Sequence, residues 1–135
     1  MPLVFRALRQ GETAKVFGGD YPTADGTCIR DYVDVRDLAD AHVRAAEALE
    51  EGLRTTTCNI GHGEGSSVLE VLDVVRAVTG RPLRHEVIDR RPRDPARIVG
   101  RVDRMAADLG WRTRHDLADM VRSAWEAETG TRVLR

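Results

Sequence analysis

The stretch Arg30–Asp31–Tyr32–Val33–Asp34–Val35–Arg36–Asp37–Leu38–Ala39–Asp40 organises the expected fold. It opens with an arginine beside a carboxylate, and its apolar residues then favour a strand over about 31–35. A helix is expected to follow as far as residue 51, with Asp37 as its N-cap and apolar positions at Leu38, Ala41, Ala45 and Leu49. A strand that feeds a helix places Arg30 at the mouth of the strand, where it can meet an anionic ligand.

The composition is that of an ordinary globular domain. The chain has 135 residues, of which 41% are hydrophobic and 32% charged, and its net charge of -1 gives no general attraction to nucleic acid or to an anionic membrane. No apolar run is long enough to span a membrane, and we expect no signal peptide after Met1. Cys28 and Cys58 lack metal-ligand spacing and favour the reducing cytoplasm, and the four scattered histidines predict no metal site.

Helical and extended segments alternate along the rest of the chain. Further strands are expected over residues 14–17, 55–60, 83–89 and 98–99. Further helices are expected over residues 2–9, 68–79 and 103–109 and from 117 to about 125. Their predicted N-caps are Ser67 in a capping box with Glu70, then Asp103, then the pair Thr113 and Asp116. The sequence therefore predicts an α/β fold with a long, turn-rich loop over residues 18–27.

A glycine run lies between a predicted strand and a predicted helix. Gly61, Gly63 and Gly65 follow the outline of a dinucleotide-binding fingerprint, and Asp89 lies at a suitable distance downstream to contact a ribose. The third glycine comes one residue too early, however, and Ser66 takes its place. A tight connection into a helix is the alternative interpretation.

An arginine loop offers a second candidate site. Arg90, Arg91 and Arg93 lie beside Asp94 on a segment that two prolines stiffen. A guanidinium group can donate two parallel hydrogen bonds to a diphosphate, and an aspartate can accept from sugar hydroxyls. The alternative is a solvated loop whose ion pairs contribute little. The residues alone leave both interpretations open.

No catalytic group is predicted. Ser66 and Ser67 adjoin a capping position without a nearby base. Short-chain dehydrogenases use a tyrosine with a lysine four residues later, but Lys15 is the only lysine and precedes both Tyr21 and Tyr32.

Together these segments closely resemble the UDP-glucose 4-epimerases. The matching stretches are VFGGDYPTADGTCIRDY at 16–32, VRDLADAHV at 35–43, residues 59–71, RRPRDPA at 90–96 and LGW at 109–111. The resemblance covers essentially the whole chain, but only the C-terminal portion of the family's polypeptide. It implies the substrate-binding part of an extended short-chain dehydrogenase fold, with the last β–α units of its Rossmann sheet and without the N-terminal NAD-binding part.

The resemblance also implies how the chain is divided into structural parts. Residues 1–135 would form one partial domain, with the last Rossmann-type strand–helix–strand at about 30–61 and the UDP-sugar-binding part at 1–29 and 62–135. The intact family is an NAD-dependent isomerase of galactose metabolism that interconverts UDP-glucose and UDP-galactose. NAD is not expected to bind this chain alone, and we expect the chain to be inactive alone.

Six site residues follow from the resemblance. The strand Lys15, Val16 and Phe17 would meet the uridine of a UDP-hexose, largely through main chain. The residues matching Arg30 and Arg91 would hold the diphosphate. Asp94 would accept from the uridine ribose.

Three positions depart from the family pattern. The family usually has glycine where Arg93 stands, histidine where Asp34 stands and aspartate where Arg101 stands. The change at Arg93 implies an altered bend of the diphosphate loop. The changes at Asp34 and Arg101 imply that selection on the sequence is relaxed. Two alternatives therefore stay open: a non-catalytic nucleotide-sugar-binding module, or a truncated gene remnant that folds poorly because strands near 31–35 and 55–60 present unpaired edges.

Overall fold

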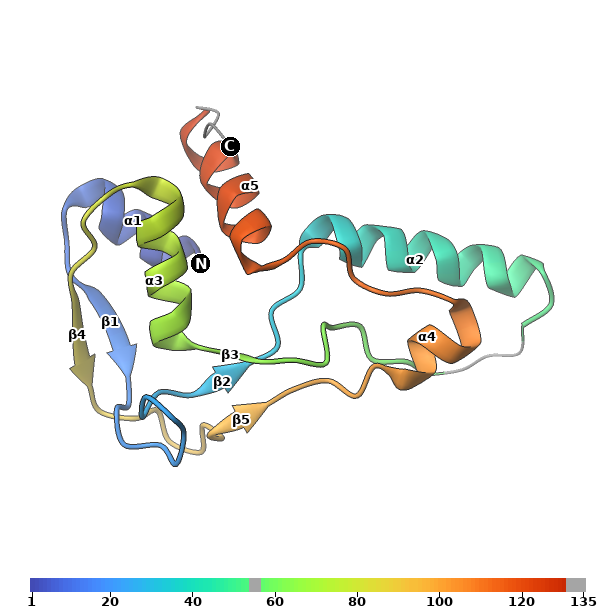
Figure 1. The fold of residues 1–135 in the computed structure, drawn as a ribbon, viewed down its shortest axis with the longest axis horizontal. Coiled ribbons are helices and arrows are strands. Elements are labelled where there is room, and N and C mark those ends of the chain that lie inside the picture. Colours follow the sequence, from blue (N-terminus) through green and yellow to red (C-terminus); the bar gives the residue numbers. More distant parts are fainter. Residues whose placement is uncertain (54–56, 131–135) are drawn as a thin grey trace.

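The computed structural model describes residues 1–53 and 57–130 and confirms the α/β fold class. Five helices and five short strands occur in this part of the chain. In chain order they are α1 Pro2–Gln10, β1 Ala14–Phe17, β2 Ile29–Arg30, α2 Val35–Glu50, β3 Ser66–Ser67, α3 Val68–Thr79, β4 His85–Ile88, β5 Arg97–Ile98, α4 Asp103–Leu109 and α5 Leu117–Thr129. Figure 1 shows an elongated molecule, with α1, α3, α5, β1 and β4 at one end and α2 and α4 at the other.

Two small sheets set the paths of the loops. β1 and β4 pair in parallel, and β2 lies between β3, which is antiparallel to it, and β5, which is parallel. One loop joins β1 to β2 and a second joins β4 to β5, so both loops begin at neighbouring strands of one sheet and end at neighbouring strands of the other. Where the two loops meet again, the Ile29 amide donates to the Ala96 carbonyl over 2.8 Å. Residues 18–28 and 89–96 consequently run together from one sheet to the other.

Two separate apolar clusters hold the ends of the molecule. The α3 core joins α1, β1, α3 and α5, and its members include Val16, Leu72, Val75 and Val121. The smaller α2 core joins α2 and α4 through Ala41, Ala48, Met105, Leu109 and Trp111. The apolar stripe of α3 and its capping box at Ser67 and Glu70 are confirmed, because Val71, Leu72 and Val75 are buried and both reciprocal hydrogen bonds form.

The strand predicted over 31–35 is not formed, and the N-cap prediction was wrong by three residues. β2 ends at Arg30, and α2 begins at Val35 with Asp34 as its N-cap, because the Asp34 carboxylate accepts from the Arg36 amide over 2.8 Å. Asp37 is instead buried in the first turn.

Residues 57–60 are also not a strand, while 55 and 56 lie outside the described residues. No strand of the described chain pairs with these residues. Of the unpaired strand edges expected near 31–35 and 55–60, residues 31–35 and 57–60 therefore form none. The division of the chain at about 30–61 remains a prediction.

Two further caps differ from the sequence-based expectation. Val102, not Asp103, is the N-cap of α4, and it makes no side-chain capping bond because valine has no acceptor. Asp116 caps α5 as predicted, through the Asp119 amide, whereas the Thr113 hydroxyl contacts His62.

Asp34 should make stability depend on pH below about 4. Two hydrogen bonds from the Arg36 guanidinium, at 2.8 and 2.9 Å, lower the pKa of this carboxyl from its usual value to about 2. A depressed native pKa contributes stability above the unfolded pKa and loses it as the pH falls through the native pKa. Since Arg36 is half exposed, we expect about 1 kcal/mol to be lost between about pH 4 and pH 2.

Urea unfolding measured across this range checks the prediction. Asp34→Asn should flatten the pH dependence by that amount. An Asp34→Asn curve that still parallels the wild type would contradict the assignment.

No helix in residues 1–53 and 57–130 is both long and apolar enough to cross a bilayer. Within the same residues, no three histidine, cysteine or acidic side chains gather to hold a metal ion.

Candidate functional site

The two neighbouring loops bring Arg30, a predicted diphosphate residue, to Asp94, the predicted ribose residue. The Arg30 guanidinium forms an ion pair with the Asp94 carboxylate, from which it is 64 residues away in sequence, and it also donates to the Ile29 carbonyl over 2.6 Å. The side chains of Arg30 and Asp94 are 22% and 24% exposed. The pair is thus held firmly by the fold while solvent and ligands can still reach it.

Arg91 lies in the same turn as Asp94, and its carbonyl accepts from the Asp94 amide over 3.2 Å. Its guanidinium carbon lies 3.9 Å from the centroid of the Phe17 ring at the end of β1. Stacking uses the face of the guanidinium plane and leaves its N–H groups at the rim for hydrogen bonding. Arg91 is exposed, so these donors can reach a ligand beside β1.

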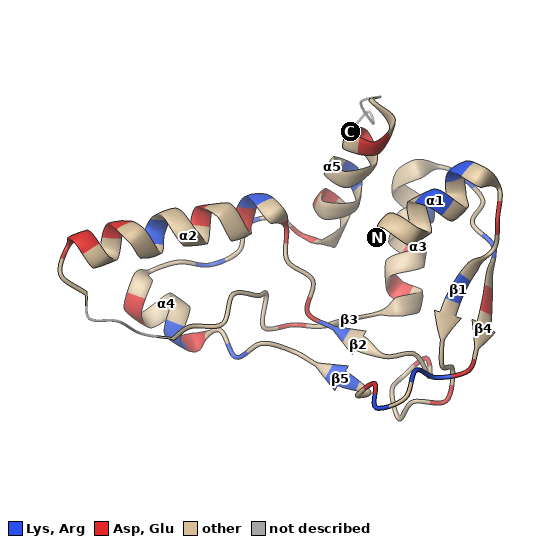
Figure 2. Cartoon of the chain, turned by 180° about the vertical axis from the view of Figure 1, so that it is seen from behind, with Lys and Arg blue, Asp and Glu red and all other residues tan. Residues whose placement is uncertain are grey.

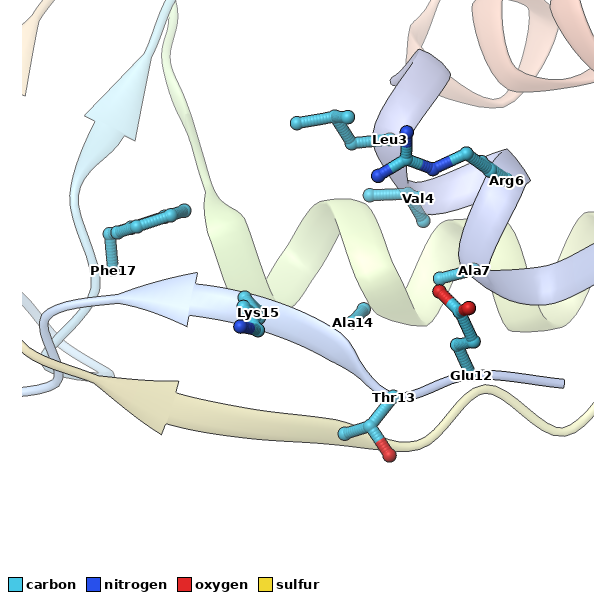
Figure 3. Close-up of a pocket in the computed structure, with 9 residues that line it drawn as sticks. All are labelled: Leu3, Val4, Arg6, Ala7, Glu12, Thr13, Ala14, Lys15 and Phe17. Atoms are coloured by element: carbon cyan, nitrogen blue, oxygen red, sulfur yellow. The ribbon is translucent and has the colours of Figure 1, made fainter. Parts of the chain in front are cut away.

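The predicted strand at residues 15–17 lies beside a cavity. Lys15 and Phe17 line a hollow of about 150 Å³ together with residues of α1, and Figure 3 shows Leu3, Val4 and Arg6 across from them. The Val16 side chain points the other way, into the α3 core. Among the described residues only β4 pairs with β1, so the second edge of β1 keeps its main-chain donors and acceptors available.

The three arginines of the loop have three different environments. Arg90 hydrogen-bonds to the Asp20 carboxylate and carbonyl and lies over the Tyr21 ring, with 4.3 Å from its guanidinium carbon to the ring centroid. The hydrogen bond from Arg90 lowers the pKa of Asp20 below its usual value. Figure 2 shows the interleaved basic and acidic segments where these loops run below β1 and β4. Arg90 therefore ties one loop to the other.

Arg93 occupies a backbone position that favours glycine. Its φ of 62° is the only positive φ at a non-glycine position in residues 1–53 and 57–130. The family resemblance implies a glycine at this position. A left-handed conformation costs a residue with a Cβ atom about 1 kcal/mol or more.

Arg93→Gly should accordingly raise the free energy of unfolding by about 1 kcal/mol. Chemical denaturation measures the change. The matched substitution Arg84→Gly, at an exposed position whose φ is not positive, should lower stability by about 0.5–1 kcal/mol because glycine loses more chain entropy on folding. If both variants were destabilised equally, strain at Arg93 would be excluded.

Asp25 holds the long loop in place. Its carboxylate accepts from the Thr27 amide and hydroxyl, both at 2.8 Å, and from the Ser67 hydroxyl at the start of α3. Burial alone would raise the pKa of Asp25, but these hydrogen bonds outweigh burial and hold it below its usual value. The loop is therefore fixed by bonds to Thr27, two residues before β2, and to Ser67, the N-cap of α3.

The glycine run does not fit an NAD site. The Asp31 carboxylate accepts from the amides of His62, Gly63 and Gly100 at 2.9, 3.1 and 3.0 Å, so these donors are already used. A Cβ atom on Gly61 would lie 2.5 Å from the same carboxylate, which shows that the glycine is needed for this close approach. Asp89, the predicted ribose contact, lies after β4, next to the other sheet. The tight-connection interpretation is supported.

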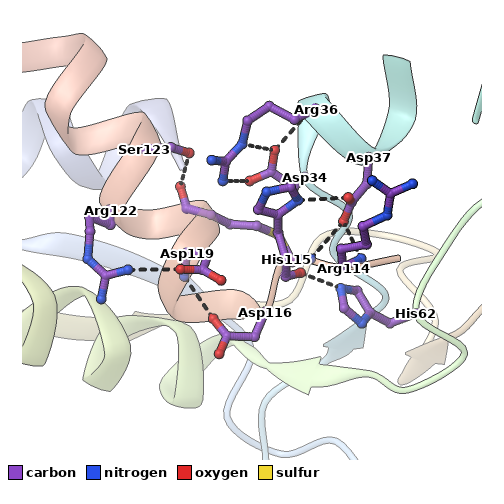
Figure 4. A network of polar contacts seen from close by, with 11 residues as sticks. Asp34, Arg36, Asp37, His62, Arg114, His115, Asp116, Asp119, Arg122 and Ser123 are labelled. Carbon is purple, nitrogen blue, oxygen red and sulfur yellow. Dashed lines mark hydrogen bonds and ion pairs between the residues drawn. The ribbon is translucent and has the colours of Figure 1, made fainter. Parts of the chain in front are cut away.

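A polar network between the two ends of the molecule has no counterpart in the sequence-based predictions. Asp37 accepts from the His115 ring over 2.7 Å and from the amides of Arg114 and His115 over 3.1 and 3.0 Å, as Figure 4 shows. Burial would raise the pKa of Asp37, but these bonds lower it. His62 continues the network to the His115 carbonyl over 2.8 Å. The sequence pointed only to Asp37, as a helix cap, because its partners lie 77 and 78 residues away along the chain.

Comparisons with known proteins find the same family resemblance. A model of the NAD dependent epimerase/dehydratase family matches residues 1–61. The UDP-glucose 4-epimerase of Rhizobium leguminosarum bv. trifolii is 46% identical over 89% of this chain, and that of Halalkalibacterium halodurans is 43% identical over 93%. The chain spans only 37% and 38% of the lengths of these curated relatives.

Solved structures show the same partial match. A Stenotrophomonas maltophila UDP-glucose 4-epimerase with bound NAD and formylated UDP-arabinopyranose superposes with a TM-score of 0.92 and 38% identity, covering 96% of this chain and 39% of that one. A Bifidobacterium longum UDP-glucose 4-epimerase in complex with NAD+ and UDP gives a TM-score of 0.75 at 33% identity, covering 87% and 36%. In sequence and in fold, the chain thus resembles part of the UDP-glucose 4-epimerases of the NAD dependent epimerase/dehydratase family.

Proposed function

We propose that this chain binds the uridine diphosphate moiety of a UDP-hexose and serves as the UDP-anchoring part of a UDP-glucose 4-epimerase. The observation that carries the proposal is that Arg30 pairs with Asp94, while Arg91, in the same turn as Asp94, stacks on Phe17 at the end of β1. Arg91 and Asp94 lie more than 60 residues after Arg30 in the sequence. The parallel pairs β1–β4 and β2–β5 bring their loop next to the loop that leads to Arg30.

Each group has a definite role in this proposal. Arg91 donates its rim N–H groups to the diphosphate while its face stays on Phe17. Arg30 turns part of its guanidinium from Asp94 to the diphosphate, and the released Asp94 carboxylate accepts from the ribose hydroxyls. The main chain at Lys15, Val16 and Phe17 meets the uridine through its unpaired edge.

The proposal assigns no hydride chemistry to these residues. The sequence contains no tyrosine followed four residues later by lysine, and the glycine run at 61–65 is occupied by Asp31. Both cysteines are free, as in a protein of the reducing cytoplasm, where we place the chain.

Calorimetry on the 135-residue chain tests the proposal. UDP and UDP-glucose should bind with a stoichiometry of about one per folded chain, and NAD should not bind, since no described residues fit it. With UDP-galactose and added NAD, the purified chain should show no formation of UDP-glucose. A well-folded chain that fails to bind UDP would refute the anchoring role, and turnover would refute the assignment of inactivity.

A further inference from the structure

Arg90 contacts one short segment of the neighbouring loop. Its guanidinium donates to both the carboxylate and the carbonyl of Asp20. The same guanidinium lies over the ring of Tyr21, which is buried and therefore offers a fixed surface. The aliphatic part of the side chain lies against the backbone of Gly18, where an added Cβ atom would be only 2.7 Å from the Arg90 Cγ. Three residues of one loop thus hold a single side chain of the other.

These contacts set the position of Arg91. Arg91 is the next residue, and its guanidinium stacks on Phe17, which directly precedes Gly18. After Arg91 the chain turns, because the Asp94 amide donates to the Arg91 carbonyl over 3.2 Å. The contacts of Arg90 therefore fix the backbone at the start of this turn and the direction from which Arg91 approaches β1.

The contacts of Arg90 become more important when a nucleotide is bound. In the proposed function, the ion pair between Arg30 and Asp94 opens to receive the diphosphate. Main-chain hydrogen bonds join the two loops where they leave one sheet and where they enter the other. Between these ends, Arg90 keeps its bonds to the first loop after the ion pair has opened.

We propose that Arg90 is a positioning residue for nucleotide binding, which together with Asp20 holds Arg91 in place for the diphosphate without contacting the nucleotide itself. This inference rests on the proposed function. A side chain that is ordered before binding saves the entropy that a mobile one would lose on binding. The side chains of Arg90 and Asp20 are 42% and 74% exposed, so their ion pair adds little to the stability of the chain. The effect should therefore appear in nucleotide binding.

A double-mutant cycle between Arg90 and Arg91 tests the inference by titration calorimetry with UDP. Arg90→Ala should lower the UDP affinity of the wild-type chain about fivefold, which is the usual cost of ordering one long side chain on binding. In an Arg91→Ala chain the same substitution should lower the affinity less than about twofold, because the group that Arg90 positions is already absent. A general loosening of the chain would lower both affinities equally.

Three further variants separate positioning from charge. Asp20→Ala removes a negative charge, which by itself would strengthen the binding of an anion, yet we expect UDP affinity to fall about threefold because Arg90 loses a partner. Arg90→Lys keeps the charge with a single donor group and should bind with an affinity between those of the wild type and Arg90→Ala. Asp73→Ala removes an exposed carboxylate of α3 and should bind UDP like the wild type.

The outcomes separate this inference from the function on which it rests. If the wild-type chain binds no UDP, the proposed function fails. If the wild type binds UDP and Arg90→Ala binds it equally well, only the role of Arg90 fails. An equal loss of affinity with and without Arg91 would overturn the positioning role, and so would tighter UDP binding by Asp20→Ala, because either result means that Arg90 does not act through Arg91.

Discussion

Replacing Asp31 by alanine is expected to lower the free energy of unfolding by about 3 kcal/mol, because three backbone amides lose their only acceptor at once. The carboxylate binds the amides of His62, Gly63 and Gly100 at 2.9–3.1 Å. These donors come from two segments that otherwise meet β2 only through two-residue ladders.

Urea denaturation of three variants tests the role of Asp31. Asp31→Asn keeps one acceptor oxygen but turns an NH₂ group toward an amide donor, so about 2 kcal/mol should still be lost. Asp73→Ala removes an exposed carboxylate of α3 that pairs with Arg76, and it should change stability by less than about 1 kcal/mol. Equal effects of Asp31→Ala and Asp73→Ala would show that the three amide bonds contribute little.

Replacing Arg91 by alanine is expected to weaken UDP binding by about 30-fold, corresponding to about 2 kcal/mol for hydrogen bonds between a guanidinium and a phosphate. The stability of the chain should hardly change, since Arg91 is exposed and contacts the protein by stacking on Phe17. Titration calorimetry, together with thermal melting of the same samples, separates the two effects.

Two comparison variants sharpen the Arg91 test. Arg91→Lys keeps the charge but loses the planar pair of donors, so its affinity should lie between those of the wild type and the alanine variant. Arg84→Ala removes an exposed arginine just before β4 and should bind UDP like the wild type. An Arg91→Ala chain with wild-type affinity and an unchanged melting curve would remove Arg91 from the site.

Most of the helices could be predicted from the sequence because the signals that define them are local. The capping box at Ser67 and Glu70, the stripe of α3 and the glycine after each of α1, α3 and α4 depend on residues within one or two turns of each other. β1 was predicted with its observed bounds and β4 within three residues. Such elements can be recognised without knowledge of the tertiary structure.

The central segment could not be predicted in the same way because its structure depends on distant partners. The apolar residues at 32, 33 and 35 have the composition of a strand, yet pairing ends at Arg30, and Asp34 then caps α2. Likewise, Asp37 looked like a cap, while its real partners are Arg114 and His115. Long-range hydrogen bonds of this kind leave no periodic trace in the sequence.

For the arginine loop, the sequence did not distinguish the separate environments of its three arginines. Arg90, Arg91 and Arg93 looked equivalent, and only the fold assigns one to the loop tie, one to Phe17 and one to a left-handed turn. The six predicted binding residues themselves remain predictions until UDP binding is measured.

The separation of the α3 core from the α2 core also has a kinetic consequence. The α2 core contains few large side chains, and hydrogen bonds to Asp31 and Asp37 help to connect it to the rest of the molecule. Local opening needs only as much free energy as the region's own contacts supply. Amide protons in the middle of α2 will therefore exchange with solvent deuterium well before those of α3, and the molecule will behave as two folding units joined by carboxylates.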